Sequence, residues 1–227
     1  MQRQENDPAA EPAVPGDIVD AVFAISCRSL PVDHAYALSQ AIQAELPWFA
    51  EEPRAGLHTV YGAASASGWM RPEGAGALLQ LSHRAKLALR LPRHRLDDAA
   101  ALLGRTLEVA GRPLRVDQVA VRPLSRITTL FSRCVILAAE GDEAAFLAAA
   151  AGELGALGIN PGTMLCGRVT PLETPARTYR TRSLMLAGLT PEQSLALQRQ
   201  GLGAERKLGC GLFIPHKDIG DLRSRSD

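Results

Sequence analysis

The 227-residue sequence predicts an α+β protein built from two tandem ferredoxin-like (RRM-like) domains, each with the element order β-α-β-β-α-β. Segments with helical periodicity alternate with short apolar segments that have the period of a strand. This order of elements runs once and restarts after the dipeptide Arg122-Pro123. Apolar residues make up 46% of the chain, which is enough to fill a core in each half. The two halves share little sequence, so the repeat is one of element order and not of residues.

The first predicted domain covers residues 18–123 and opens with a strand at residues 18–27. A helix follows at residues 32–46, where the apolar side chains fall on one stripe, namely Ala35, Leu38, Ile42 and Leu46. The other elements expected in this half are a strand at 56–62, two strands or a hairpin at 77–82 and 85–91, a short helix at 94–103, and strand again at 106–121, broken by a turn at Gly111-Arg112-Pro113.

The second predicted domain covers residues 124–217. Its expected elements are a strand at 127–139, a helix at 142–157, two strands at 163–171 and 176–187, a helix at 191–200 and a closing strand at 210–214. The first of these helices is opened by Asp142 and ends at Gly158. Thr190 is the expected N-cap of the second helix, with Pro191 at its first position and Gln193 completing a capping box.

The ends of the chain differ from its body. Residues 1–17 are polar, acidic and rich in proline, and they lack an apolar signal core, so we expect a disordered leader on a cytoplasmic protein. A flexible tail is expected at residues 218–227. No run of about 18 apolar residues occurs, so neither a transmembrane helix nor a membrane partner is expected. The cysteines are far apart and form no CxxC pair, which favours buried reduced thiols at Cys27, Cys134, Cys166 and Cys210.

Charge is distributed unevenly along the chain. The formal net charge of +1 alone argues against a nucleic-acid partner. However, residues 84–133 contain eleven Lys and Arg against four acidic residues, and residues 160–217 contain eight against three. Arginine outnumbers lysine by 22 to 3, and its planar fork suits phosphate contacts, although a GC-rich genome gives the same bias. The acidic leader therefore precedes a basic body that is suited to RNA.

The most informative segment is GLGAERKLGCGLFIP, residues 201–215. Glycine permits positive φ and close approach of another backbone. A loop of this kind can offer N–H groups and two charges to a phosphate. The residues expected to bind RNA here are Gly201, Gly203, Arg206, Lys207, Gly209 and Gly211. Arg180 and Arg182 are added because residues two apart share one face of a strand. The alternative is that the loop is only a turn before the last strand.

Four segments together resemble the CRISPR repeat-processing endoribonucleases, the sixth CRISPR-associated protein family, with features of its MYXAN subtype. The segments are LPVDHAYALSQAI, GLHTVYG, DEAAFLAAAAGELGALGI and GLGAERKLGCGLFIP. The resemblance covers about residues 18–215, and the glycine-rich loop is the family's signature. It implies cleavage of CRISPR repeat RNA without metal or other cofactor, giving 5′-hydroxyl and 2′,3′-cyclic phosphate ends. It also implies that the enzyme can stay on the 3′ hairpin of the mature crRNA beside other effector-complex subunits.

Metal-free RNA cleavage needs groups that move protons at the 2′-hydroxyl and at the leaving 5′ oxygen. Histidine suits both roles because its unperturbed pKa is about 6.5. His34, at the entry of the first helix, resembles the family's general acid or base, and His58 in the second strand is the other catalytic candidate. For either residue, the alternative is a surface histidine or one that is satisfied in the core. His83 and His94 lie beside arginines, where phosphate contact is the better expectation.

Other kinds of site have little support in the sequence. The Cys and His spacings match no zinc pattern, and neither a GxSxG nor a GxxxxGK[ST] motif occurs. We therefore expect a metal-independent endoribonuclease. Two alternatives stay open, a non-catalytic crRNA-binding subunit with the same fold and a ferredoxin-like module that binds a small molecule.

Overall fold

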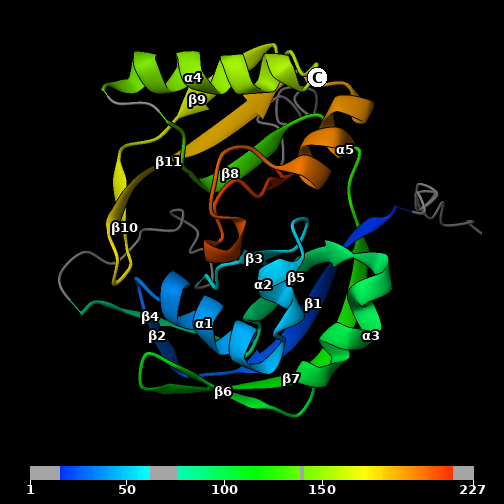
Figure 1. Cartoon of the computed structure of the whole chain (residues 1–227), viewed down its shortest axis with the longest axis vertical. Helices are drawn as coiled ribbons and strands as arrows, with labels where there is room; N and C mark the ends of the chain where they lie inside the picture. The colour runs from blue at the N-terminus through cyan, green and yellow to red at the C-terminus, as the bar shows by residue number, and fades with distance from the viewer. Residues whose placement is uncertain (1–15, 62–75, 139–140, 217–227) are drawn as a thin grey trace, which may run out of the picture.

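The computed structural model describes residues 16–61, 76–138 and 141–216. Figure 1 shows two sheets, one in the lower half of the view and one in the upper half, each with helices of its own. The lower half holds the first part of the chain and the upper half holds the second. A connection in green runs between them after the last long strand of the first half.

The first half forms a five-stranded sheet in the order β3 (Gly56–His58), β5 (Lys86–Pro92), β1 (Ile18–Ser26), β7 (Arg112–Pro123) and β6 (Thr106–Val109). A separate ribbon pairs β2 (Ser29–Pro31) with β4 (Leu78–Gln80). The helices of this half are α1 (Ala35–Glu45), α2 (Trp48–Glu51) and α3 (Leu96–Ala99), and two short 3-10 turns, η1 (Arg93–Arg95) and η2 (Ala100–Leu102), flank α3.

One face of the first sheet is apolar because alternate residues of its central strands point toward the helices. Ala21 and Phe23 of β1 belong to the same buried cluster as Leu38 and Ile42 of α1. The stripe predicted for the first helix is therefore confirmed. The opposite face of β1 carries Asp20. This residue lines a cavity together with residues of the second half of the chain.

The second half forms a sheet in the order β10 (Thr170–Glu173), β11 (Thr178–Ala187), β8 (Leu130–Val135) and β12 (Ile214–Pro215), and β9 (Thr163–Cys166) also pairs with β11. Its helices are α4 (Glu143–Ala156), α5 (Pro191–Gln200) and the 3-10 turn η3 (Arg206–Leu208). Asp142 caps α4 by accepting from Ala145 N at 3.0 Å, and the capping box of α5 is complete, as the sequence predicts.

Both halves have one topology. In the first sheet β1 lies between β5 and β7, and β3 pairs with β5. In the second sheet β8 lies between β11 and β12 in the same way, and β10 pairs with β11. The predicted tandem ferredoxin-like fold is therefore confirmed. The hairpin alternative for residues 77–82 and 85–91 is wrong, because β4 pairs with β2 while β5 joins the main sheet. The strand expected at 163–171 is divided into β9 and β10.

The boundaries of the two domains, at residues 18, 123 and 217, stay a proposal. The predicted leader lies outside the described residues except for Gly16 and Asp17, and the predicted tail lies wholly outside them. Of the described helices, none is both long enough and apolar enough to cross a membrane.

Candidate functional site

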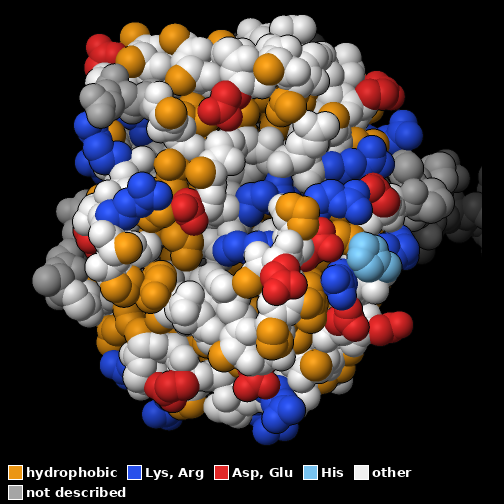
Figure 2. All heavy atoms as spheres, in the orientation of Figure 1, with side chains coloured by type: hydrophobic (Ala, Val, Ile, Leu, Met, Phe, Trp, Pro, Cys, Tyr) orange, Lys and Arg blue, Asp and Glu red, His pale blue; other side chains and the backbone are white. Residues whose placement is uncertain are grey.

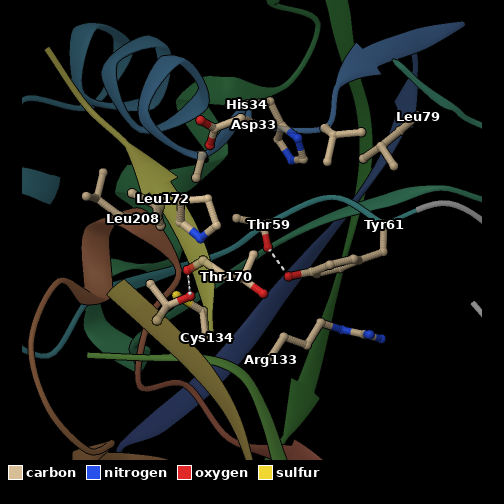
Figure 3. A pocket seen from close by; sticks show the side chains of 14 residues that line it. Asp33, His34, Thr59, Tyr61, Leu79, Arg133, Cys134, Thr170, Leu172 and Leu208 are labelled. Carbon is tan, nitrogen blue, oxygen red and sulfur yellow. Dashed lines mark hydrogen bonds between the residues drawn. The ribbon is translucent and has the colours of Figure 1, made fainter. Parts of the chain in front are cut away.

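Two adjoining cavities lie between the halves of the molecule. The smaller has a volume of about 80 Å³ and contains His34, and the larger has a volume of about 250 Å³ and contains His58. Thr59, Tyr61 and Arg133 line both cavities. The structure therefore brings the two predicted histidines to one region, and Arg133 of β8 lines the cavity of each. Figure 3 shows the cavity of His34, with Tyr61 and Arg133 on its lining.

His34 is held by the backbone on both of its ring nitrogens. Nδ1 lies 2.8 Å from the carbonyl oxygen of Pro31, and Nε2 accepts a hydrogen bond from Val60 N at 3.1 Å. A carbonyl can only accept and an N–H can only donate, so these two contacts fit the neutral ring with its proton on Nδ1. His34 is 3% exposed and directly precedes α1. In this geometry it ties the entry of the helix to residues 59–61.

His58 has a different environment. Its Nε2 lies 3.5 Å from Oδ1 of Asp20, which is long for a hydrogen bond, and no group of the described residues forms a hydrogen bond with this buried nitrogen. Arg90 donates to both carboxylate oxygens of Asp20, from Nε and Nη2, each at 2.8 Å. This forked contact fixes the carboxylate beside the imidazole of His58. The side chain of His58 is 17% exposed and lines the larger cavity.

Asp20 stays ionised because of its partners. Burial alone would raise the pKa of this carboxyl group, but the charge and hydrogen bonds of Arg90, together with His58, hold it well below its usual range. Arg90 is itself fully buried and also donates to the carbonyl oxygens of Gln198 and Phe213, at 3.0 and 2.8 Å. The arginine that holds Asp20 is therefore bonded to the second half of the chain.

Arg133 brings positive charge to the same region. Its guanidinium carbon lies 4.0 Å from the centroid of the Tyr61 ring, which is a cation–π distance. The Tyr61 hydroxyl accepts a hydrogen bond from Thr59 (Figure 3). Arg122 and Lys86 also line the larger cavity. On the face shown in Figure 2, blue Lys and Arg side chains gather across the middle, where the two halves meet.

The glycine-rich loop is packed against protein backbone. A Cβ atom on Gly203 would lie 2.0 Å from the carbonyl oxygen of Ile136, and one on Gly211 would lie 2.1 Å from that of Leu202. All four glycines of the loop have positive φ. Gly209 faces β3, since its Cβ would lie 3.0 Å from the carbonyl oxygen of Leu57. The glycines are thus required by contacts within the protein, including one that joins the halves.

The two cations of the loop also point into the protein. Arg206 donates to the carbonyl oxygens of Gln200, Arg54 and Arg199. Lys207 donates to the carbonyls of Glu52 and Ala55 and lies 4.6 Å from the centroid of the Phe49 ring. Burial, with a smaller contribution from Arg90, lowers the pKa of Arg206 to about 10. Both cations join the loop to the segment before β3, and their contact with RNA stays a prediction.

Arg180 and Arg182 lie on one face of β11, as predicted, but apart from the histidines. Both line a small cavity beside the start of α4, whereas Thr181 between them lines the cavity of His34. Neighbouring residues of a strand face opposite sides, so the arginine pair is on the other face of the sheet. Arg182 also donates to the carbonyl oxygen of Gly167 at 2.8 Å.

The expectation of four reduced cysteines is wrong for one pair. Cys134 of β8 and Cys210 of the glycine-rich loop form a disulfide, while Cys27 and Cys166 are free thiols. The pairing arises because the loop returns to β8, where Gly211 N donates to the carbonyl oxygen of Cys134 at 2.7 Å. A separation of 76 residues hides this neighbourhood in the sequence.

Sequence reasoning missed Asp20, Tyr61 and Arg133. An acidic residue in the middle of an apolar strand, as in IVDAVFAIS, is the signal that could have found Asp20. Nothing local marks Tyr61 or Arg133, because each becomes significant only when the halves meet. In the described part of the chain, no three His, Cys, Asp or Glu side chains gather as a metal site would require.

The fold of this chain is that of solved CRISPR-associated proteins. One structure, named "CRISPR associated protein Cas6", matches with a TM-score of 0.61 and 11% identity over 88% of this chain and 99% of its own. A Cas6-related protein from Pyrococcus furiosus matches with a TM-score of 0.59 and 11% identity over the same shares. At such low identity these likenesses show the fold alone.

Sequence comparison identifies the family. The family model described as Cas6 Crispr matches residues 19–218. A curated "CRISPR-associated endonuclease Cas6" from Myxococcus xanthus (strain DK1622) is 34% identical over 197 residues, which cover 87% of this chain and 81% of that protein. The chain belongs to the Cas6 family, and the resemblance read from the sequence is confirmed.

Proposed function

We propose that this protein is an endoribonuclease that cuts CRISPR repeat RNA without metal. Membership of the Cas6 family supports the class of activity, since a relative with 34% identity is named an endonuclease. The single observation that carries the site is the pair of His58 and Asp20, which faces Arg133 across the larger cavity. A base, a residue that orients it and a cation that can meet a phosphate are together there.

In the proposed reaction, His58 removes the proton of the 2′-hydroxyl. The 2′ oxygen then forms a bond to phosphorus while the bond from phosphorus to the 5′ oxygen breaks, and that oxygen takes a proton from water. The products are a 2′,3′-cyclic phosphate and a 5′-hydroxyl. Asp20 orients the ring and Arg133 balances the charge that gathers on the phosphate.

His34 has a less direct role in this proposal. Its ring nitrogens are occupied by Pro31 and Val60, so Nε2 can move a proton only after the bond from Val60 breaks. We propose that His34 positions residues 59–61, which carry Thr59 and Tyr61 into the site. Of the two histidines that the sequence predicts as catalytic, the geometry favours His58 for proton transfer.

Retention of the product belongs to the same proposal. An enzyme that stays on the 3′ hairpin of the mature crRNA could join other effector subunits, and a cytoplasmic location fits this role. RNA contacts of the glycine-rich loop and of Arg180 and Arg182 remain predictions.

The test is incubation of the full chain with a repeat transcript in excess EDTA. We expect cleavage at one position, a cyclic phosphate on the upstream fragment and no cutting when the nucleotide before the scissile bond is 2′-deoxy. A strict need for added Mg²⁺ would contradict the mechanism. Tight binding without cleavage would instead identify a non-catalytic crRNA-binding subunit, and neither cleavage nor binding would favour a module for small molecules.

A further inference from the structure

A third cavity, of about 560 Å³, lies in the first half and takes no part in the reaction proposed above. Three segments that are distant in sequence meet around it, the corner between β1 and β2, the turn after β4 and the start of β7. Each contributes one basic side chain, and these are Arg28, His83 and Arg112. Ser26, Cys27 and Ser29 complete the polar lining.

The basic side chains of this cavity are not neutralised by the protein. All three are exposed, and within the described residues none of them forms an ion pair. Asp117, on β7, already accepts from Ser26 and from Arg115. Burial raises the pKa of the Cys27 thiol, and the charge of Arg112 offsets part of that rise. Unpaired cations around one cavity create a positive potential that favours an anion.

The cavity is connected to the site between the halves by the β2–β4 ribbon. Leu79 of β4 lines the cavity that contains His34, while Leu81, the first residue after β4, lines the basic cavity. Leu81 N donates to the carbonyl oxygen of Arg28 at 3.0 Å, so the pairing of the two segments continues to the basic end. Two residues of a strand span about 7 Å, which a single RNA strand can readily bridge.

We propose that this cavity binds the phosphodiester backbone of the single-stranded RNA that runs out of the site between the halves. Two arginines offer forked donors that match phosphate oxygens. Among the described residues, no Phe, Tyr or Trp side chain lines the cavity, so the contacts are to the backbone and are tolerant of sequence. The inference rests on the proposed RNA substrate and adds a second place where that substrate is held.

Binding measurements test the proposal with 2′-deoxy repeat RNAs that cannot be cut. Three are compared, a minimal RNA around the scissile bond and the same RNA extended on its 5′ or its 3′ side. We expect Arg28→Ala/Arg112→Ala to weaken binding of one extended RNA by about tenfold and to reduce its salt slope by about 1.4. Binding of the minimal RNA should not change. The extension that responds identifies the flank that occupies the cavity.

The control is Arg126→Ala/Arg168→Ala, which removes two exposed positive charges elsewhere. Equal effects of the two double variants would overturn the proposal, because general attraction would then explain them. Equal weakening of all three RNAs by Arg28→Ala/Arg112→Ala would also overturn it.

A chemical footprint gives a second readout. The extended RNA should slow alkylation of Cys27 by iodoacetamide, measured by mass spectrometry, and should leave Cys166 unaffected, since Cys166 is equally a free thiol of intermediate exposure. Unchanged labelling of Cys27, or equal protection by inorganic phosphate, would show that no RNA strand is held there. These results do not depend on cleavage, so loss of the proposed catalytic function in the EDTA assay is distinguishable from failure of this inference.

Discussion

The two halves of the molecule have the same topology, but their facing surfaces carry different chemistry. The first half presents Asp20 and His58 to the larger cavity, on the face of its sheet that is turned toward the second half, with the buried Arg90 bonded to Asp20. The second half presents Arg133 and the glycine-rich loop, which returns to β8 and to β3. The first half thus holds the proposed proton-transfer group. The second half supplies a positive charge and the loop contacts that join the two halves. The ferredoxin-like repeat is a scaffold whose copies have separate tasks.

The strongest test of this division is His58→Ala. We expect single-turnover cleavage to fall by about 10²–10⁴-fold, the usual loss for a positioned proton-transfer group. Affinity for 2′-deoxy repeat RNA should stay nearly constant, since the phosphate contacts remain. Cleavage at the wild-type rate would remove His58 from the mechanism and return His34 to first place.

The glycine loop can be tested by adding one methyl group. Gly203→Ala should lower the free energy of unfolding by about 3–5 kcal/mol, because its Cβ collides with a carbonyl and its φ is positive. The control is Gly152→Ala in α4, which has open space around it and should stabilise by about 0.5–1 kcal/mol. If neither change lowers the free energy of unfolding in urea, the close packing of the glycine-rich loop against the rest of the protein is not important for stability.

His34→Ala sharpens the contrast between the histidines. The change leaves Val60 N–H and the Pro31 carbonyl unpaired, which should cost about 2–4 kcal/mol of unfolding free energy. Cleavage per folded molecule should fall by less than about tenfold, well below the effect expected for His58→Ala. His94→Ala, on the surface, should change stability by at most about 0.5 kcal/mol. A stable variant with abolished cleavage would make His34 catalytic.

Replacing Arg206 and Lys207 distinguishes two roles for the glycine-rich loop, packing against the first half and contact with RNA. Because Arg206 and Lys207 donate to backbone carbonyls, replacing both with Met should lower the unfolding free energy by about 1–3 kcal/mol. The dependence of RNA affinity on salt should stay the same. A slope reduced by about 1.4 would instead support the phosphate contacts expected from the sequence.

The last prediction concerns the dependence of stability on pH. Burial, and then repulsion from Arg206, lowers the pKa of Lys207 to about 8 from its usual 10.5, with Glu52 opposing part of the change. Between these values the unfolded chain holds a proton that the folded chain lacks, so stability rises with pH. Relative to Lys207→Met, the wild type should gain at most about 1.4 kcal/mol per pH unit between pH 8 and 10 in urea titrations. Parallel profiles for the two proteins would contradict the lowered pKa.

Much of the fold could be predicted because its signals are local. The apolar stripe of α1 and the capping box of α5 each depend on residues that are close together in the sequence. The site could be predicted only in part, since His58 is visible in a strand but Arg133 reaches it by tertiary packing. The interpretation of Arg206 and Lys207 shows the limit most clearly. A basic glycine-rich loop suits a phosphate, yet it suits the carbonyl ends of another segment equally well, and only the neighbours decide between them.

The bonds of Arg90 bear on how this protein could be divided. One guanidinium holds Asp20 in the first half and two carbonyls from the second, while fully buried. A fragment ending near residue 123 would expose that cation without its carbonyl partners, and a fragment starting there would lose the donor for Gln198 and Phe213. Removing one side of such a contact is costly. Split-protein reporters or domain exchanges between relatives should therefore fail at this seam unless the arginine and both acceptor segments are transferred together.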